Sequence, residues 1–335
     1  MSRTRVYLTV DVESAEERGP LGPAQGYDVR VWGRFEGRRD ELGLRLLLGE
    51  MEAAGLRGTF FVEPLGADFF GKDELGRVVG EIVSRGHDVQ LHLHPTQRRP
   101  DWRTRGQHRL PDDMADYSLD DQVALLKDGS DRLVAAGASR PRAFRAGNFG
   151  ADNVTWQALA AAGLHLDSSY DPGYPSCRIE WPQPEVTLFD TGAGVWELPV
   201  SNFIEPSGDL RHLQIMAVSA REVIDYFQQA RDLGLEEVTL VTHSFELCHI
   251  DDPARRRGRL NRVNLARLRT ICRYLADHRD AFEVETVGAL AARLPPPSGR
   301  AAAAGGRPLP RGNRLLRSQR LVEQAWKRVE ARIHR

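Results

Sequence analysis

The sequence is short of cysteine and has no long apolar run. Its 335 residues include three cysteines, Cys177, Cys248 and Cys272, without a paired spacing. Scattered cysteines argue against a disulfide framework and a thiolate metal site, and in favour of a reducing compartment. No stretch approaches the roughly 20 apolar residues of a membrane-spanning helix, and the first residues lack the apolar segment of a signal peptide. These absences predict a cytoplasmic protein.

The sequence also has no overall excess of charge, but the balance hides two parts of opposite sign. It contains 46 basic and 47 acidic side chains. Residues 296–335 hold ten of the basic side chains and only two acidic ones, a net charge of +8, which leaves residues 1–295 with a net charge of −9. An acidic main body gives no basic patch for a nucleic-acid backbone. We therefore expect no nucleic-acid partner.

Short β-rich runs alternate with longer segments of helical periodicity from the first residues to about Ala292. This alternation is typical of parallel strands joined by crossover helices, so the sequence predicts an α/β fold with about seven strands. Val6–Val12, Gly58–Val62 and Asp88–His94 are the first three expected strands, and Asp40 is expected to cap the first helix. We expect one domain over residues 1–294.

The remaining residues differ in composition from this domain. Residues 295–312 are rich in Pro, Gly, Ala and Arg without an apolar period, which predicts a flexible linker. Residues 313–335 predict a basic amphipathic helix. Such a helix can lie on an anionic membrane or dock on a partner protein, so a membrane-peripheral location is an alternative to a purely cytoplasmic one. Its apolar positions are Leu315, Val322, Trp326, Val329 and Ile333.

Two pairs of polar side chains stand at predicted strand ends. His92 and His94 are two residues apart, which puts both imidazoles on one face near the end of their strand, and Asp11 and Glu13 share a face in the same way. In an α/β barrel both pairs open at the same end. One carboxylate and two imidazoles suit Zn²⁺ or another divalent first-row metal. Each pair alone has a simpler explanation, because strand-end histidines are often only hydrogen-bonded and paired acids can cap a loop; together they favour a metal.

His243 ends another apolar run, Val238–Thr242, and is followed by Ser-Phe-Glu246. Hydrolysis of an amide requires a group that protonates the leaving nitrogen, and an imidazole titrates in the right range. His243 is therefore a candidate general acid. A structural histidine and a helix-start glutamate are the alternative interpretation of the same residues.

Six segments in a fixed order carry a family pattern: Leu8–Glu13, Gly58–Val62, Gly86–Pro95, Phe144–Asn148, Glu197–Val200 and Leu240–Ser244. Over about residues 5–290 the chain resembles the polysaccharide deacetylase family, also called the NodB-homology or carbohydrate esterase 4 family. The resemblance implies a distorted (β/α) barrel of about seven strands. It also implies removal of acetyl groups from sugar polymers or related amides with one divalent metal ion.

The resemblance assigns roles to individual residues. Asp11 resembles the general base, His243 the general acid and Arg145 the residue that keeps the base ionised. Zn²⁺ is the expected metal, with Co²⁺, Ni²⁺, Mn²⁺ and Fe²⁺ as alternatives. The expected metal ligands are Glu13, His92 and His94, and the expected substrate contacts are Trp196, Asn148 and Glu246.

The pattern departs from the family at two positions. Val12 stands where the family has its metal aspartate, so the metal is assigned to Glu13, and the roles of Asp11 and Glu13 could be exchanged. Thr96 stands where the second histidine is usual, so His94 must take that role from the strand. The form His-x-His-Pro resembles branches linked to lipopolysaccharide and other surface-glycan assembly.

Three functions are consistent with these features. The first is a metal-dependent deacetylase that acts on an acetamido sugar of a surface-polysaccharide or lipopolysaccharide precursor. The second is an amidase or deformylase that acts on a small non-sugar amide. The third is a catalytically decayed glycan-binding or scaffold protein. Three loop aromatics could stack on sugar rings or pack locally: Trp102, Tyr174 and Trp181.

Overall fold

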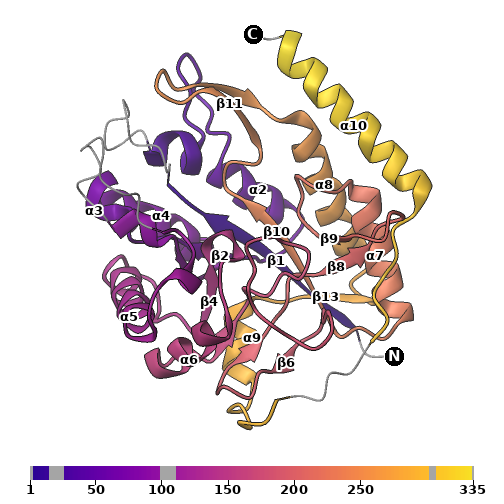
Figure 1. The fold of residues 1–335 in the computed structure, drawn as a ribbon. Coiled ribbons are helices and arrows are strands. Elements are labelled where there is room, and N and C mark those ends of the chain that lie inside the picture. The colour runs from indigo at the N-terminus through magenta and orange to yellow at the C-terminus, as the bar shows by residue number, and fades with distance from the viewer. Residues whose placement is uncertain (1–2, 15–25, 99–110, 302–306, 334–335) are drawn as a thin grey trace.

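The computed structural model describes residues 3–14, 26–98, 111–301 and 307–333, and side chains of the last range only as far as Trp326. Trp102 lies outside the described residues. The chain folds around a curled nine-stranded sheet with the order β10-β1-β2-β3-β4-β5-β7-β6, in which β13 also pairs with β1 (Figure 1). Its strands are β1 (Thr4–Val12), β2 (Thr59–Val62), β3 (Asp88–Leu93), β4 (Ala143–Ala146), β5 (Leu166–Asp167), β6 (Phe189–Asp190), β7 (Trp196–Glu197), β10 (Glu237–His243) and β13 (Phe282–Val284).

All pairings in this sheet are parallel except that of β6 with β7. Strand β1 lies inside the sheet, and only Arg5 among its nine residues is not fully buried. Strands of parallel sheets are covered on both faces, which explains this nearly continuous burial. The predicted α/β fold with a parallel barrel-like sheet is confirmed.

The free edge of β10 is covered by an irregular segment. The backbone N–H of Val241 donates to the carbonyl of Leu213, and the N–H of Ile215 donates to the carbonyl of Val241. The Ser201 hydroxyl accepts from the N–H of Thr239 on the same strand. Backbone groups that an open sheet would expose are thereby paired, and the sheet curls into a partly closed barrel.

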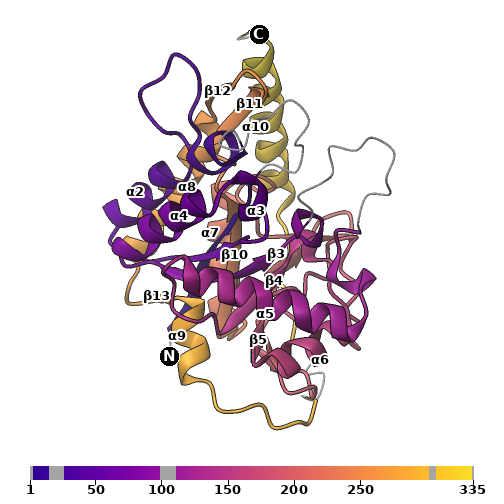
Figure 2. The ribbon, with the colours of Figure 1, turned by 90° about the vertical axis from the view of Figure 1, so that its left-hand side faces the viewer.

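Helices surround the sheet, with α4, α5 and α6 on one side in Figure 1 and α7, α8 and α10 on the other; Figure 2 shows the first group from its outer face. In α4 the buried positions Leu75, Val78, Val79 and Ile82 follow the period of a helix that packs by one face. The helices are α2 (Leu44–Ala53), α3 (Ala67–Phe70), α4 (Lys72–Ser84), α5 (Leu119–Ala135), α6 (Asn153–Ala162), α7 (Ala220–Asp232), α8 (Arg262–Asp277), α9 (Val287–Arg293) and α10 (Arg314–Ile333). None of the described helices is both long and apolar enough to cross a membrane.

Local signals set most helix starts. Ser118 caps α5 by accepting from the N–H of Asp121, and Ser219 forms a capping box with Glu222 at the start of α7. The expected cap at Asp40 is wrong: α2 begins after Gly43, and Asp40 instead binds the guanidinium of Arg38. Two hairpins complete the fold: β8 (Asn202–Ile204) with β9 (Leu210–His212), and β11 (Cys248–Asp252) with β12 (Arg257–Leu260).

The segment after α9 returns to the body. The hydroxyl of Ser298 donates to Asp190, and the N–H of Gly312 donates to the carbonyl of Ile204. Helix α10 then packs on α7 through Arg320, which is 2% exposed and binds Glu205. The expected linker therefore makes contacts with the body at both of its described ends.

Candidate metal centre

The carboxyl ends of β1, β3 and β10 meet at one mouth of the barrel. Strand β1 pairs with β10 in a register that sets Asp11 opposite His243. Glu13 follows β1 directly, and His94 follows β3, which contains His92. Parallel strands all point the same way, so these side chains gather at one edge as the sequence predicted.

Glu13, His92 and His94 bring three ligand atoms together. The Oε1 atom of Glu13 lies 3.3 Å from Nε2 of His92 and 3.4 Å from Nε2 of His94. The three ligand atoms lie within 4.8 Å of one another, and all three residues are buried. A carboxylate and two imidazoles converging on one point form the donor set of a catalytic zinc site.

Hydrogen bonds at the far side of each ring set the tautomer of both imidazoles. His92 donates from Nδ1 to the carbonyl of Arg145 at 2.8 Å, and His94 donates from Nδ1 to Asp112 at 2.8 Å. Both Nε2 atoms therefore face Glu13. The Nε2 atom of His94 is buried and has no hydrogen-bond partner. A buried imidazole nitrogen without a partner is costly unless a cation takes its lone pair, so the residues fit a divalent metal.

The charges of this cluster shift its ionisation strongly. Burial alone would raise the pKa of Glu13, but the neighbouring His94 and His92 outweigh burial and hold the pKa well below its usual range. Burial would likewise lower the pKa of His94, yet Glu13 and Asp112 raise it well above the ordinary value. The cluster thus keeps its carboxylates ionised and ready to face a positive charge.

Asp11 belongs to a separate ion pair beside the cluster. Its Oδ1 atom accepts from Nη1 of Arg145 at 2.8 Å, and both side chains are almost fully buried. Arg145 also donates to the carbonyl and the hydroxyl of Ser168, so its position is fixed from the opposite side. The geometry favours Glu13 as the ligand and Asp11 as the base, because Oε1 of Glu13 lies near Nε2 of both His92 and His94 whereas Asp11 is held by Arg145.

His243 is held against the opposite wall of the site. Its Nδ1 donates to Glu246 at 2.8 Å, and its Nε2 lies 3.6 Å from Oε1 of Glu13 and 3.9 Å from Oδ2 of Asp11. Burial acts to lower the pKa of His243, but Glu246, Glu13 and Asp11 together raise it to about 9. His243 therefore carries a proton at neutral pH with Nε2 facing the pocket.

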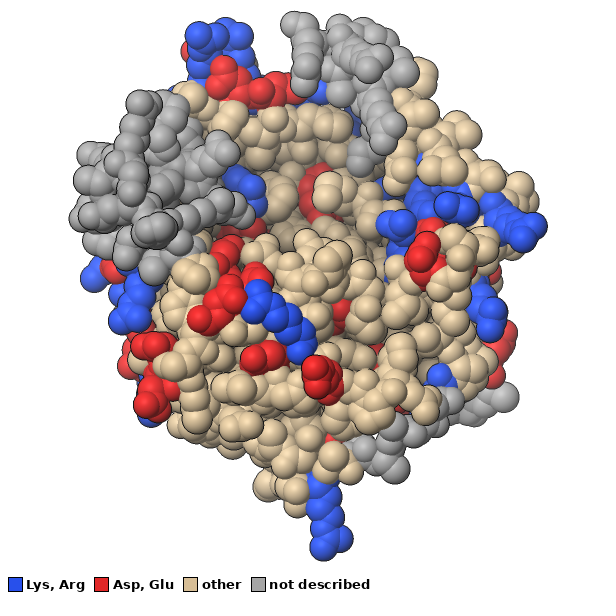
Figure 3. Space-filling model, in the orientation of Figure 1, with Lys and Arg blue, Asp and Glu red and all other residues tan. Residues whose placement is uncertain are grey.

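A pocket of about 230 Å³ opens between these groups. Figure 3 shows a face of the molecule that is hollowed near its middle, with acidic atoms inside the hollow. Arg30 reaches the pocket, where it binds Oε2 of Glu13 at 3.0 Å and stacks over the ring of Phe245 at 3.8 Å. Arg30 thereby occupies one oxygen of Glu13 and leaves Oε1 free for a cation. The other lining residues are Asp11, His94, Ala146, Asn148, Phe149, Tyr174, Gln214, Met216 and His243.

No protein-family model matches the sequence, and no curated protein is similar to it. Among solved structures, the chain is similar to a candidate polysaccharide deacetylase from Mycobacterium smegmatis, with a TM-score of 0.54 and 18% identity over 88% of this chain and 93% of that one. The chain has the polysaccharide deacetylase fold.

The chain is also similar to a solved glucanotransferase and to a solved carbohydrate esterase. A 4-α-glucanotransferase from Thermococcus litoralis has a TM-score of 0.52 and 10% identity over 88% of this chain and 41% of that one. A family 4 carbohydrate esterase from Streptomyces lividans has a TM-score of 0.41 and 15% identity over 90% of this chain and 97% of that one. A barrel shared with a glucanotransferase does not determine the reaction, so function must be argued from the site.

Within this deacetylase fold the structure brings most of the expected site residues together: Asp11, Glu13, His92, His94, Arg145, Asn148 and His243. Glu246 lies behind His243 and does not line the pocket. It also accepts hydrogen bonds from the hydroxyl of Thr242 and from the backbone N–H of Met216. It holds the imidazole of His243 and is not among the residues that line the pocket. Of the loop aromatics, Tyr174 lines the pocket, whereas Trp181 stacks on Phe189 at 4.2 Å.

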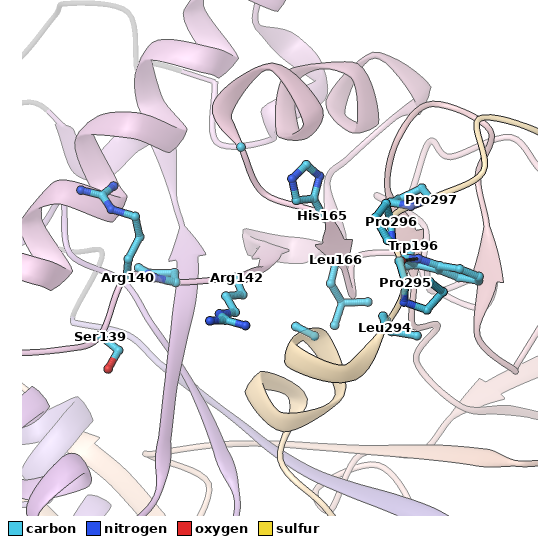
Figure 4. A pocket seen from close by; sticks show the side chains of 13 residues that line it. Ser139, Arg140, Arg142, His165, Leu166, Trp196, Leu294, Pro295, Pro296 and Pro297 are labelled. Atoms are coloured by element: carbon cyan, nitrogen blue, oxygen red, sulfur yellow. Dashed lines mark hydrogen bonds between the residues drawn. The ribbon is translucent and has the colours of Figure 1, made fainter.

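Trp196 is not brought to the metal centre. It begins β7, and the pocket that it lines lies at the amino ends of the strands (Figure 4). The physical reason is its register: Trp196 pairs with Leu166, the first residue of β5, so it lies at the start of its strand. The expected contact between Trp196 and the substrate of this site is therefore corrected.

Three residues of the site were not found by sequence reasoning. Asp112 orients His94, Arg30 binds Glu13, and Gln214 donates to Glu246. Each comes from a segment outside the main strands, and a single acid, arginine or glutamine in a loop carries no periodic signal.

Asn148 and Phe149 at the pocket have φ angles of 55° and 53°. Residues other than glycine rarely adopt this backbone conformation, and it occurs often at functional sites.

Proposed function

We propose that the protein is a metal-dependent hydrolase that removes the N-acetyl group from an acetamido sugar. The observation that carries this proposal is the convergence of Oε1 of Glu13 with Nε2 of His92 and of His94, three buried ligand atoms within 4.8 Å of one another. The fold of a candidate deacetylase and two acid–base pairs beside the cluster support it. An enzyme of this kind acts on a C–N bond with water as the second reactant.

A divalent cation held by Glu13, His92 and His94 would supply Lewis-acid polarisation to a water molecule and to the amide carbonyl. Zn²⁺ is the metal proposed because the donor set contains two imidazoles and one carboxylate. The two proton transfers of the reaction are then assigned to two residues of the pocket, Asp11 and His243.

Asp11 accepts the proton of the attacking water as the new C–O bond forms at the carbonyl carbon. Arg145 keeps the Asp11 carboxylate ionised before this step and stabilises its position through the bond at 2.8 Å. Asp11 would thus act as the general base, and a base held in a fixed position increases the rate of the reaction.

His243 donates the proton that the leaving nitrogen needs. The C–N bond breaks as Nε2 of His243 gives its proton to the amine, and acetate and the free amino sugar are the products. Glu246 holds Nδ1 of the same ring and stabilises its protonated form. Asp11 and His243 reach the same pocket from the neighbouring strands β1 and β10.

The pocket supports a small acylated group as the substrate portion bound here. Its volume of about 230 Å³ is below the roughly 300–1,000 Å³ typical of sites for drug-sized ligands. Asn148 offers a polar side chain and Tyr174 an aromatic one at its wall. We infer a single acetamido sugar ring, carried by a surface-polysaccharide or lipopolysaccharide precursor.

The test measures metal and product together. We expect the purified protein to hold about one Zn²⁺ or Co²⁺ ion per chain, and His92→Ala with His94→Ala to remove it. Acetate release from N-acetylglucosamine-containing oligosaccharides should fall by at least about a hundredfold in Asp11→Asn. His278→Ala, which changes an exposed histidine just after α8, is the matched control and should retain both metal and activity.

Three results would contradict this proposal in different ways. Unchanged metal content in the double histidine variant would remove the metal centre. Formate or acetate release only from small non-sugar amides would favour an amidase or deformylase. Sugar binding without metal and without turnover would favour a decayed glycan-binding protein.

A second proposal concerns α10. We infer that this helix contacts an anionic membrane surface from the cytoplasmic side. Among the described residues, α10 carries four large hydrophobic side chains that are 52–70% exposed: Leu315, Leu321, Val322 and Trp326. In Figure 3 basic side chains gather where α10 begins. Cations beside an exposed tryptophan complement anionic lipid headgroups.

Vesicle sedimentation tests this second proposal. The full chain should bind vesicles of phosphatidylcholine with phosphatidylglycerol and leave pure phosphatidylcholine vesicles unbound. Val322→Glu with Trp326→Glu should abolish binding, while Val134→Glu, an exposed position on α5, should leave it unchanged. Absence of binding would contradict the membrane proposal. Formation of a dimer that the same variants disrupt would show that α10 contacts a second copy of the chain instead.

A further inference from the structure

A second pocket, of about 580 Å³, lies at the opposite ends of the strands from the metal centre. Arg142 directly precedes β4, His165 directly precedes β5, and Trp196 begins β7, and these three strands are neighbours in the sheet. In Figure 4 Arg142 and His165 lie on one side of Leu166, and Trp196 lies on the other side beside the prolines. The prolines that follow α9, residues 295–297, form the wall beside Trp196.

The charges around this pocket are of one sign. Its lining contains Arg140, Arg142 and His165 but no acidic residue, although residues 1–295 have a net charge of −9. Arg140 is bound to Asp131 at 2.8 Å and extends away from the others in Figure 4. Arg142 is exposed and has no ion-pair partner within the described part of the chain. Its guanidinium is therefore available to an anion.

The wall opposite Arg142 is apolar and fixed in place. The indole N–H of Trp196 donates to the carbonyl of Pro295 at 2.9 Å, which holds the ring against the proline wall. Leu166, Leu294 and Ala291 add further apolar surface. The pocket thus joins an unpaired cation to an aromatic and aliphatic surface, within the size range of small-ligand sites.

We propose that this pocket binds a phosphorylated ligand with an attached ring, of the class of a nucleoside diphosphate. Guanidinium groups bind phosphate oxygens through two parallel hydrogen bonds, and an indole offers its face to a planar base. Arg142 stands four residues before Ala146 on β4, about 13 Å away at the rise of a strand, and Ala146 lines the metal centre. The two sites are therefore separate, and the proposal does not depend on the hydrolase reaction.

Calorimetric titration of the full chain tests this proposal with uridine diphosphate as the probe. Uridine, which lacks the phosphates, and pyrophosphate, which lacks the ring, should each bind at least about tenfold more weakly. Arg142→Gln should raise the Kd for uridine diphosphate by about tenfold, because it removes one charge-assisted contact. Trp196→Phe should raise it by about threefold, since the smaller ring keeps part of the stacking.

Two matched variants locate the binding. Arg140→Gln changes an arginine of the same pocket that is already paired, and should alter the Kd by less than about threefold. His94→Ala disables the metal centre and should leave the affinity for uridine diphosphate unchanged. If Arg142→Gln unfolds, Arg142→Lys keeps the charge but loses the planar fork, and it should still weaken binding by about threefold or more.

The proposal fails on any of four results. These are no binding of uridine diphosphate at millimolar concentration, equal weakening by the substitutions at Arg140 and Arg142, loss of binding in His94→Ala, or equal affinity for uridine or pyrophosphate alone. The third of these would place the ligand at the metal centre and would leave the hydrolase proposal intact.

Discussion

At the scale of single residues, the candidate metal centre depends on side chains that do not bind the metal themselves but orient the residues that would bind it. The carboxylate of Asp112 accepts from Nδ1 of His94 and from the hydroxyl of Thr96, so it ties the histidine strand to a distant loop. The His94 interaction, together with the hydrogen bonds from Thr96 and Asn148, outweighs burial and lowers the pKa of Asp112 below its ordinary value. Asp112 is thus a fixed negative charge that sets the orientation of one imidazole.

Replacement of Asp112 should weaken metal binding without removing a ligand. We expect Asp112→Asn to raise the Kd for Zn²⁺ by about 10- to 100-fold, because outer hydrogen bonds to metal-bound histidines have effects of this size. Competition with a chelator of known affinity measures the change. Asp120→Asn, an exposed position on α5, is the control. Equal affinities of the two variants would show that Asp112 does not orient His94.

At the scale of secondary structure elements, α10 is attached by charge rather than by apolar packing. Arg320 is buried against Glu205 and lies 3.6 Å from Glu222, while Arg267 of α8 binds Glu323 at 2.7 Å. These pairs turn one face of α10 to the body and leave Val322 and Trp326 outside. The sequence predicted an amphipathic helix, but its apolar stripe is the face that the body does not cover.

Removal of the buried arginine should release this helix. Arg320→Gln removes the buried one of three arginines that pair with Glu205, and Arg211 and Arg317 remain. The cost should therefore stay below the roughly 3–5 kcal/mol of a fully broken buried pair, and undocking of α10 can relieve it. Hydrogen exchange in residues 314–326 should therefore become much faster than in the native chain, while the strands of the sheet keep their protection. Arg314→Gln, which changes an exposed arginine of the same helix, should leave exchange unchanged. Unaltered protection in Arg320→Gln would mean that other contacts hold α10.

At the scale of the whole molecule, two buried acids lie inside the barrel near the base–arginine pair. Asp167 accepts from the hydroxyl of Ser169, and Glu197 accepts from the indole N–H of Trp156; both acids are fully buried. Burial and the neighbouring Asp167 raise the pKa of Glu197 well above its ordinary value, and burial raises that of Asp167 to about 6. Folding therefore raises the proton affinity of both acids.

The raised pKa values make the free energy of unfolding depend on pH. A raised pKa in the folded state gives stability that is complete below the unfolded pKa, near 4.5 for Glu197, and that is lost as the pH rises toward the folded value. Relative to Glu197→Gln, the native chain should lose unfolding free energy as the pH rises above about 5, by at most about 1.4 kcal/mol per pH unit. Urea denaturation across this range measures the difference, with Glu180→Gln as an exposed control. Parallel pH profiles of the native chain and Glu197→Gln would contradict a shared buried proton.

The sequence by itself determined the alternation of strands and helices and the positions of Asp11, Glu13, His92, His94 and His243 at strand ends. It did so because periods of two and 3.6 residues are local, and because parallel strands send their carboxyl ends to one edge. Only the tertiary structure decided which acid pairs with Arg145, that Asp112 and Arg30 reach the cluster, and that Trp196 stands at the far end of the barrel. These outcomes depend on register and on loops that return from distant parts of the chain, where no repeating pattern marks the residue that will arrive.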